Sequence, residues 1–127
     1  MSETADVVVT GGGVIGASTA FNLALNGVTN VTLVERDSIA SGNSGRSSAI
    51  IRMHYTTPPL VQLAVYSLRI FQRFREIVGD ESGFVPSGYV AIVGEGDREA
   101  LEFNVRMQQE HGAPTSVIEP ADVKRIA

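Results

Sequence analysis

The sequence contains no cysteine and no tryptophan, and its only histidines are His54 and His111, which stand far apart. Without cysteine, the chain has no disulfide framework, no thiol nucleophile and no cysteine-based metal site. Two histidines in different settings do not form a set of metal ligands, so we expect no metal site. The absence of cysteine agrees with a reducing compartment, and we expect a cytoplasmic protein.

Basic residues and long apolar runs are also scarce. The 14 acidic residues outnumber the 10 basic ones, and the net charge of −4 disfavours nucleic acid as a partner because phosphates require a basic surface. The N-terminal MSETAD has no basic segment, and glycine soon interrupts the apolar run that follows, which predicts neither a signal peptide nor a membrane span. With 43% apolar and 19% charged residues, the composition is that of a globular chain.

The most informative feature of the sequence is a glycine-rich turn, VVVTGGGVIG, at residues 7–16. Residues 6–10 predict a buried strand, because Val7, Val8 and Val9 form a continuous apolar run that a turn signal ends. A helical stripe then predicts a helix over residues 14–26 that ends before Gly27, and residues 31–34 (VTLV) predict a second strand. This is a β–α–β unit of about thirty residues. The expected packing stripe of the helix is Val14, Ala17, Ser18, Phe21 and Leu25, with Ala20 and Ala24 flanking it.

The glycines fit the pattern G-x-G-x-x-G, which is typical of dinucleotide binding. Gly11 permits a tight turn, Gly13 allows a pyrophosphate to approach the backbone, and Gly16 allows close packing of helix on strand. The start of the helix offers unpaired N–H groups to phosphates. Glu35 follows Gly16 by nineteen residues, where its carboxylate can accept hydrogen bonds from an adenosine ribose and repel the extra phosphate of NADP. The alternative is a glycine-rich turn in an ordinary α/β protein.

The segment after the second strand favours FAD over NAD. An NAD-binding domain would soon enter another helix and a third strand, whereas this chain continues as ERDSIASGNSGRSSAIIRMHY, rich in serine and glycine. Such a segment can wrap an extended cofactor, and residues 44–51 can open a helix that faces the same phosphates. A solvated surface loop is the alternative interpretation.

These segments resemble a known family. GGGVIGASTAFNLALNG, VTLVER and SGNSGRSSAIIRMHY are similar to the FAD-dependent amine and amino-acid oxidoreductases of the D-amino-acid oxidase superfamily, which includes sarcosine oxidase β-subunits, dimethylglycine dehydrogenases and glycine or proline oxidases. The resemblance runs along essentially the whole chain. It implies an α/β fold, with an FAD-binding Rossmann-like βαβ unit and flavin-contacting loop over residues 1–57. Residues 58–127 would begin an α+β substrate domain. The implied reaction is oxidation of an amine or amino acid to an imine, with hydride transfer to FAD.

The resemblance also implies roles for individual residues. The residues implied to hold the pyrophosphate are Gly11, Gly13, Val14, Ile15 and Gly16, with Glu35 on the ribose and Arg36 beside the adenine. Those implied to lie along the ribityl chain and flavin are Gly42, Asn43, Arg46, Ser47, Ser48 and Ala49. Arg52 matches the position that binds the substrate carboxylate, for which a planar guanidinium is well suited, with a structural ion pair as the alternative. His54 and Tyr55 are candidates to line the same pocket.

Two departures from the family pattern lead to further expectations. Some members attach FAD through a histidine in the serine- and glycine-rich segment, which here has none, so we expect non-covalent FAD. Only two candidate strands belong to a parallel sheet that normally has five or six, so we expect completion by the rest of its own chain or another subunit. The alternatives are an NAD-dependent dehydrogenase domain and a non-catalytic nucleotide-binding subunit. The expected small-molecule partner is an amine or amino acid.

The second half of the sequence predicts mostly helix. Pro58 and Pro59 open an amphipathic helix that ends at Gly79. Residues 84–93 predict a β-hairpin or a bent pair of strands, and Asp97 is expected to cap a helix that runs to His111. Residues 116–118 predict a short strand, and a last helix opens at residues 119–121.

Overall fold

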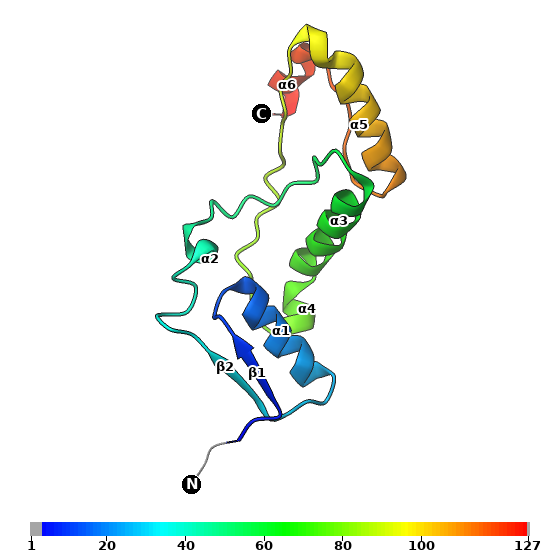
Figure 1. Ribbon diagram of the computed structural model, residues 1–127. Helices are drawn as coiled ribbons and strands as arrows, with labels where there is room; N and C mark the ends of the chain where they lie inside the picture. The colour runs from blue at the N-terminus through cyan, green and yellow to red at the C-terminus, as the bar shows by residue number, and fades with distance from the viewer. Residues whose placement is uncertain (1–3, 127) are drawn as a thin grey trace. The chain divides into compact units, whose positions relative to one another are not determined.

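The computed structural model describes residues 4–126, with side chains described as far as Val123 (Figure 1). The chain divides after Ile50 into two compact units, and each is described by itself. The first unit contains β1 (Val7–Thr10), α1 (Val14–Leu25), β2 (Val31–Val34) and α2 (Asn43–Arg46). The second contains α3 (Pro58–Gln72), α4 (Phe74–Val78), the 3-10 turn η1 (Glu95–Asp97), α5 (Arg98–Glu110) and α6 (Pro120–Ile126).

The first unit is built on a parallel pair of strands. β1 and β2 lie side by side, with Val7 opposite Val31 and Thr10 opposite Val34, and α1 packs beside them (Figure 1). Partly buried and exposed residues alternate along both strands, as the pleat requires. The helix ends at Leu25 with Asn26 as its C-cap, and Gly27 follows in the left-handed region with φ +87°. The predicted β–α–β unit is therefore confirmed, including the bounds of the second strand.

The packing face of α1 agrees with the predicted stripe only at Phe21 and the flanking Ala20. Val14 and Leu25 are 63% and 62% exposed, and Ala17 and Ser18 are exposed as well. The partly buried residues of the helix are Gly16, Ala20, Phe21 and Leu23. The physical reason is the backbone contact at Gly16, which brings the helix against the carbonyl oxygen of Gly11 and sets the rotation of the helix about its axis.

The serine- and glycine-rich segment forms less helix than expected. Instead of a helix over residues 44–51, a single turn spans Asn43–Arg46. Ser47 has extended backbone angles, φ −77° and ψ 146°, and its hydroxyl accepts a hydrogen bond from the amide of Ala49 at 3.1 Å. This local side-chain bond competes with helical hydrogen bonding, which explains why the helix stops.

The second unit is held together by a small apolar core. Its buried residues are Met53, Val61, Val65, Met107 and Ala113. α3 begins at Pro58 as predicted, but a turn at Arg73 separates it from α4, so the expected single helix is two. Gly79, with φ +89°, ends α4 at the predicted position. Within residues 4–126, no helix is long and apolar enough to cross a membrane.

Two predicted β elements do not form. The structure assigns no strand to Phe84–Val93 or to residues 116–118. A strand requires a hydrogen-bonded neighbour, and Pro86 contributes no backbone N–H within the first of these segments. Val85 and Ile92 remain 72% and 88% exposed. Asp97 stands at the N-cap of α5 as predicted, but its side chain makes no capping hydrogen bond.

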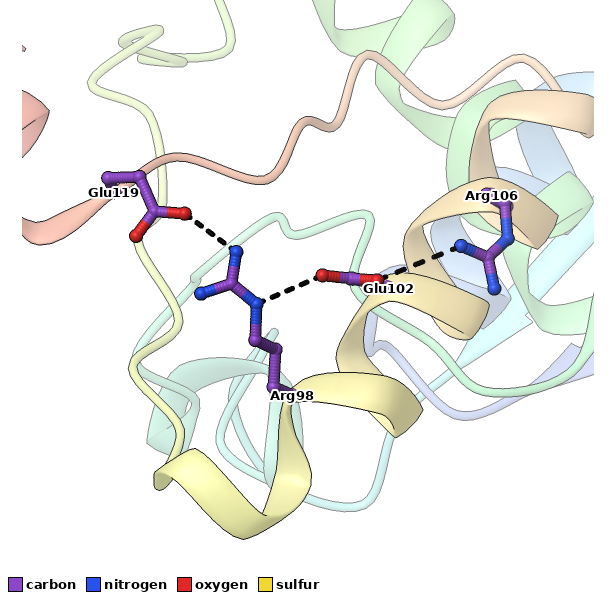
Figure 2. Close-up of polar contacts among 4 residues, drawn as sticks. All are labelled: Arg98, Glu102, Arg106 and Glu119. Atoms are coloured by element: carbon purple, nitrogen blue, oxygen red, sulfur yellow. Dashed lines mark hydrogen bonds and ion pairs between the residues drawn. The ribbon is translucent and has the colours of Figure 1, made fainter.

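Ion pairs join the start of α5 to the segment that precedes α6. Figure 2 shows Arg98 between two carboxylates, with Nε 3.0 Å from Oε1 of Glu102 and Nη2 2.7 Å from Oε1 of Glu119. Arg106 lies on the other side of Glu102, with its Nη1 4.0 Å from Oε2. The two carboxylates, Glu119 more than Glu102, raise the pKa of Arg98 above its ordinary value.

Candidate dinucleotide-binding site

The glycine-rich turn connects the end of β1 to the start of α1. Gly11 has φ +106°, a left-handed conformation that favours glycine, and its N–H donates to the carbonyl of Val34 at 2.8 Å. At Gly16, a Cβ atom would overlap the carbonyl oxygen of Gly11. Both glycines are thus required by the backbone, in the roles the pattern predicts.

The N-terminus of α1 is open to an anion. Its first turn contains no acidic residue, and the N-cap residue Gly13 has no side chain to cap it. Within residues 4–126, no hydrogen bond is found to the amide of Gly13 or of Ile15. Exposed amides at a helix start, together with the helix dipole, suit a phosphate group.

Glu35 is held by the backbone on both of its oxygens. Its Oε2 accepts the N–H of Gly12 at 2.7 Å, and its Oε1 accepts the N–H of Asp37 at 3.1 Å. These two bonds, that from Gly12 first, lower the pKa of Glu35 below its ordinary value of 4.5. The side chain is therefore ionised at neutral pH, and each oxygen keeps a lone pair for a further donor.

Ser44 belongs to the site, although the sequence analysis did not select it. Its Oγ accepts the N–H of Val14 at 2.9 Å, at the start of α1. The amide of Ala40 also donates to the carbonyl of Gly12 at 3.0 Å, so the segment after β2 returns to the glycine-rich turn. A Cβ at Gly45 would overlap the carbonyl oxygen of Ala40. No local pattern signals Ser44, because its partner lies 30 residues earlier.

The other predicted cofactor residues are placed near the surface of the first unit. Those that are exposed are Val14, Ile15, Arg36, Gly42, Asn43, Arg46, Ser47, Ser48 and Ala49. Asn43 and Arg46 lie on α2, the turn that also carries Ser44. Among the residues that the structure describes, no carboxylate forms an ion pair with Arg46. Their contacts with FAD stay predictions.

Arg52 lies in the second unit within a group of aromatic residues. Its guanidinium carbon is 5.4 Å from the ring centroid of Tyr55, a cation–π distance. Hydrogen bonding to Tyr89, and then to Tyr55, raises the pKa of Arg52 above its ordinary value. No carboxylate in the described part of the chain forms an ion pair with Arg52, which disfavours the structural ion pair considered as an alternative.

The neighbouring His54 and Tyr55 are both partly buried and both contact α5. Gln108 Nε2 lies 3.2 Å from Nδ1 of His54 and donates to the carbonyl of Tyr55 at 2.9 Å. No group of three or more potential metal ligands occurs within the described residues. Sequence reasoning missed Gln108, because a glutamine on a helix ordinarily indicates an exposed position.

The fold and site define a class: a β–α–β dinucleotide-binding protein with an open helix N-terminus and an acid at the end of the second strand. The family described as FAD dependent oxidoreductase (DAO) matches residues 6–127. The chain belongs to this family, and its cofactor is FAD. The expectation of FAD is thereby confirmed, and the alternative of an NAD-dependent dehydrogenase domain is wrong.

Similar proteins agree with this assignment. FAD-dependent oxidoreductase domain-containing protein 1 of Bos taurus is 34% identical over 134 residues, which cover 97% of this chain and 28% of that protein. Sarcosine oxidase subunit beta of an Arthrobacter species is 32% identical, over 95% of this chain and 30% of that one. Human mitochondrial sarcosine dehydrogenase is 27% identical, over 99% of this chain and 14% of that protein. The chain thus spans less than a third of the length of these relatives.

A solved structure shows the same fold. The crystal structure of L-proline dehydrogenase from P. horikoshii superposes with a TM-score of 0.79, over 98% of this chain and 33% of that one, at 24% sequence identity. This likeness confirms the expected fold class, an α/β arrangement that corresponds to part of that protein's fold. The parallel strands and the helix between them belong to that arrangement.

Proposed function

We propose that the protein oxidises a primary or secondary amine or amino acid to an imine, with hydride transfer to FAD, and that this chain supplies the dinucleotide-binding part. The observation that carries the proposal is the Glu35 carboxylate, fixed 2.7 Å from the amide of Gly12 beside an open helix start. The choice of substrate class is supported by relatives named for sarcosine and dimethylglycine.

The residues present fit FAD. The amides of Gly13 and Ile15 are available to pyrophosphate oxygens. The absence of a side chain at Gly13 makes room for Ser44, whose Oγ lies 3.0 Å from where a Cβ would stand. Ser44 accepts the N–H of Val14, so its own hydroxyl proton is free to be donated to a phosphate oxygen. The two oxygens of Glu35 accept hydrogen bonds from the ribose hydroxyls. When bound, the flavin supplies an acceptor for the hydride equivalent.

Arg52 is proposed to bind the substrate carboxylate. A guanidinium stays charged at every physiological pH and can hold a carboxylate through two parallel hydrogen bonds. The ring of Tyr55 and the hydrogen bond with Tyr89 leave the charge of Arg52 unneutralised, because no carboxylate pairs with it in the described part of the chain. Its charge is thus available to an anionic substrate.

The test is flavin reduction by amines in the protein expressed from its complete open reading frame. A panel of primary and secondary amino acids is added without oxygen, and loss of the visible flavin absorption is followed. We expect bleaching by at least one amino acid, and release of the flavin on acid precipitation if it is bound non-covalently. A yellow protein that no amine bleaches would instead favour a non-catalytic nucleotide-binding subunit.

A second measurement addresses Arg52. Arg52→Met is expected to raise KM for a carboxylate-bearing amine by about tenfold or more, because a charged hydrogen-bond partner is lost. The same variant is expected to leave KM unchanged for an amine without a carboxylate. Unchanged kinetics with both substrates would remove Arg52 from the substrate site.

A further inference from the structure

The second unit contains a fully buried amide that contacts the segment next to Arg52. Gln108 on α5 is 0% exposed and is the largest fully buried side chain in the described part of the chain. A buried amide is costly unless it is hydrogen-bonded. Its Nε2 serves both Tyr55 and His54, whereas its Oε1 has no partner among the described residues. The helix therefore uses its buried amide as a double donor to residues 54 and 55.

The chemistry of these contacts fixes the orientation of the amide. The carbonyl oxygen of Tyr55, 2.9 Å away, can only accept, so the atom that faces it must be the NH2 group of Gln108. The second N–H of that group then points to Nδ1 of His54 at 3.2 Å, which must accept. His54 is therefore the neutral tautomer with its hydrogen on Nε2.

The same contacts lead from α5 to the guanidinium of Arg52. The segment is anchored at Met53, which is buried in the core with Val61 and Met107, and again at the carbonyl of Tyr55. The ring of Tyr55 lies under the guanidinium, 5.4 Å from centroid to carbon. Arg52 itself is exposed, so its direction depends on these neighbours.

We propose that Gln108 is a positioning residue, which fixes the Tyr55 backbone and the His54 tautomer and thereby orients Arg52 toward an anionic ligand. The inference rests on the proposed function in one respect, because it takes the ligand to be the substrate carboxylate. The hold of Gln108 on His54 and Tyr55 does not depend on that identification.

The test compares two neighbouring glutamines of α5 in the FAD-loaded protein from the complete open reading frame. Gln108→Met keeps the length of the side chain and removes both donors. Gln109→Leu is the matched control, since Gln109 is exposed and donates to the carbonyl of Thr115 at 2.8 Å. The readouts are the ¹⁵N resonances of the His54 ring and Arg52 Nε, and binding of acetate, with acetamide as the uncharged comparison.

Gln108→Met is expected to release the His54 tautomer and to shift the Arg52 resonance. It should also weaken the binding of acetate about tenfold, because a displaced Arg52 guanidinium loses one hydrogen bond to the acetate. KM for a carboxylate-bearing amine should rise by a similar factor with kcat unchanged. Gln109→Leu should move none of these. Gln108→Glu gives a second, opposite signature: its carboxylate accepts, so Nδ1 of His54 must carry the hydrogen.

The outcomes separate the two proposals. If both Gln108 variants keep the acetate affinity and the Arg52 resonance of the parent, the positioning role is overturned. A His54 tautomer that is the same in the parent and in Gln108→Glu also overturns it. If Arg52→Met leaves acetate binding unchanged, the carboxylate role of Arg52 fails. The role of Gln108 is then decided by the two nitrogen resonances alone: a shift in Gln108→Met supports it, and none overturns it.

Discussion

At Gly16 the carbonyl oxygen of Gly11 fills the space that a side chain would need, so α1 can lie this close to the glycine-rich turn only if residue 16 is glycine. Gly16→Ala must push α1 away from β1, and we expect it to destabilise the protein by about 1–3 kcal/mol and to reduce bound FAD. The control is Gly96→Ala, because a Cβ there meets nothing within 4 Å. Denaturant unfolding and flavin content per chain measure both effects. Equal stability of the parent and Gly16→Ala would contradict the close packing.

Glu35 leads to a pH prediction. Its hydrogen bonds with Gly12 and Asp37 lower the pKa in the folded protein below the ordinary value of 4.5. A lowered folded pKa contributes stability above pH 4.5, and this contribution is lost as the pH falls through the folded pKa. We therefore expect the thermal unfolding temperature to fall more steeply on acidification in the parent than in Glu35→Gln.

Glu110→Gln is the matched control for Glu35→Gln. It removes the same charge from an exposed position at the end of α5, where no ion pair is found within residues 4–126. This variant should retain the steep acid response of the parent. A Glu35→Gln variant whose unfolding temperature follows the parent's at every pH would show that the backbone bonds to Glu35 contribute nothing to stability.

At the scale of elements, the site depends on how the segment after β2 returns to the start of α1. Ser44→Ala removes the acceptor of the Val14 N–H, a loss comparable to that of a helix cap, about 1 kcal/mol. We expect FAD to bind about fivefold more weakly, measured by flavin fluorescence during titration. Ser38→Ala, in the same segment, is the control because no hydrogen bond of its hydroxyl is found in the described part of the chain. Equal FAD affinity in the two variants would contradict the role of Ser44.

Elements whose signal is local were predictable from the sequence. β1, α1 and β2 follow from two β-branched runs, a helical period between them and the glycines that follow β1 and α1, and Glu35 follows from its place after β2. The contacts of Ser44 with Val14 and of Gln108 with His54 could not be predicted from the sequence, because they join positions 30 and 54 residues apart. The hairpin expected at Phe84–Val93 failed for a related reason: strand propensity is realised only where a partner supplies the hydrogen bonds.

At the scale of the whole molecule, the parallel strand pair leaves one face open. Val8 and Val34 are 57% and 42% exposed on the strands, and each strand has one edge without a partner among the described residues. Parallel sheets ordinarily have both faces covered. The proteins this chain resembles are more than three times as long. Within the first unit, the strand pair beside the candidate site is therefore covered by α1 on one face, while Val8 and Val34 on the strands remain exposed.

This open face leads to a prediction about residues 1–127 expressed on their own. We expect them to bind FAD at least about tenfold more weakly than the product of the complete open reading frame, because only part of the population holds the binding-competent arrangement. They should also bind a fluorescent apolar dye, and Val8→Thr with Val34→Thr should reduce that signal without lowering FAD affinity. Titration of FAD into both proteins gives the comparison. Equal affinities would mean that Gly11, Gly16 and Glu35 hold their geometry without any cover on the exposed face of β1 and β2, and that the β–α–β unit alone is sufficient for the cofactor.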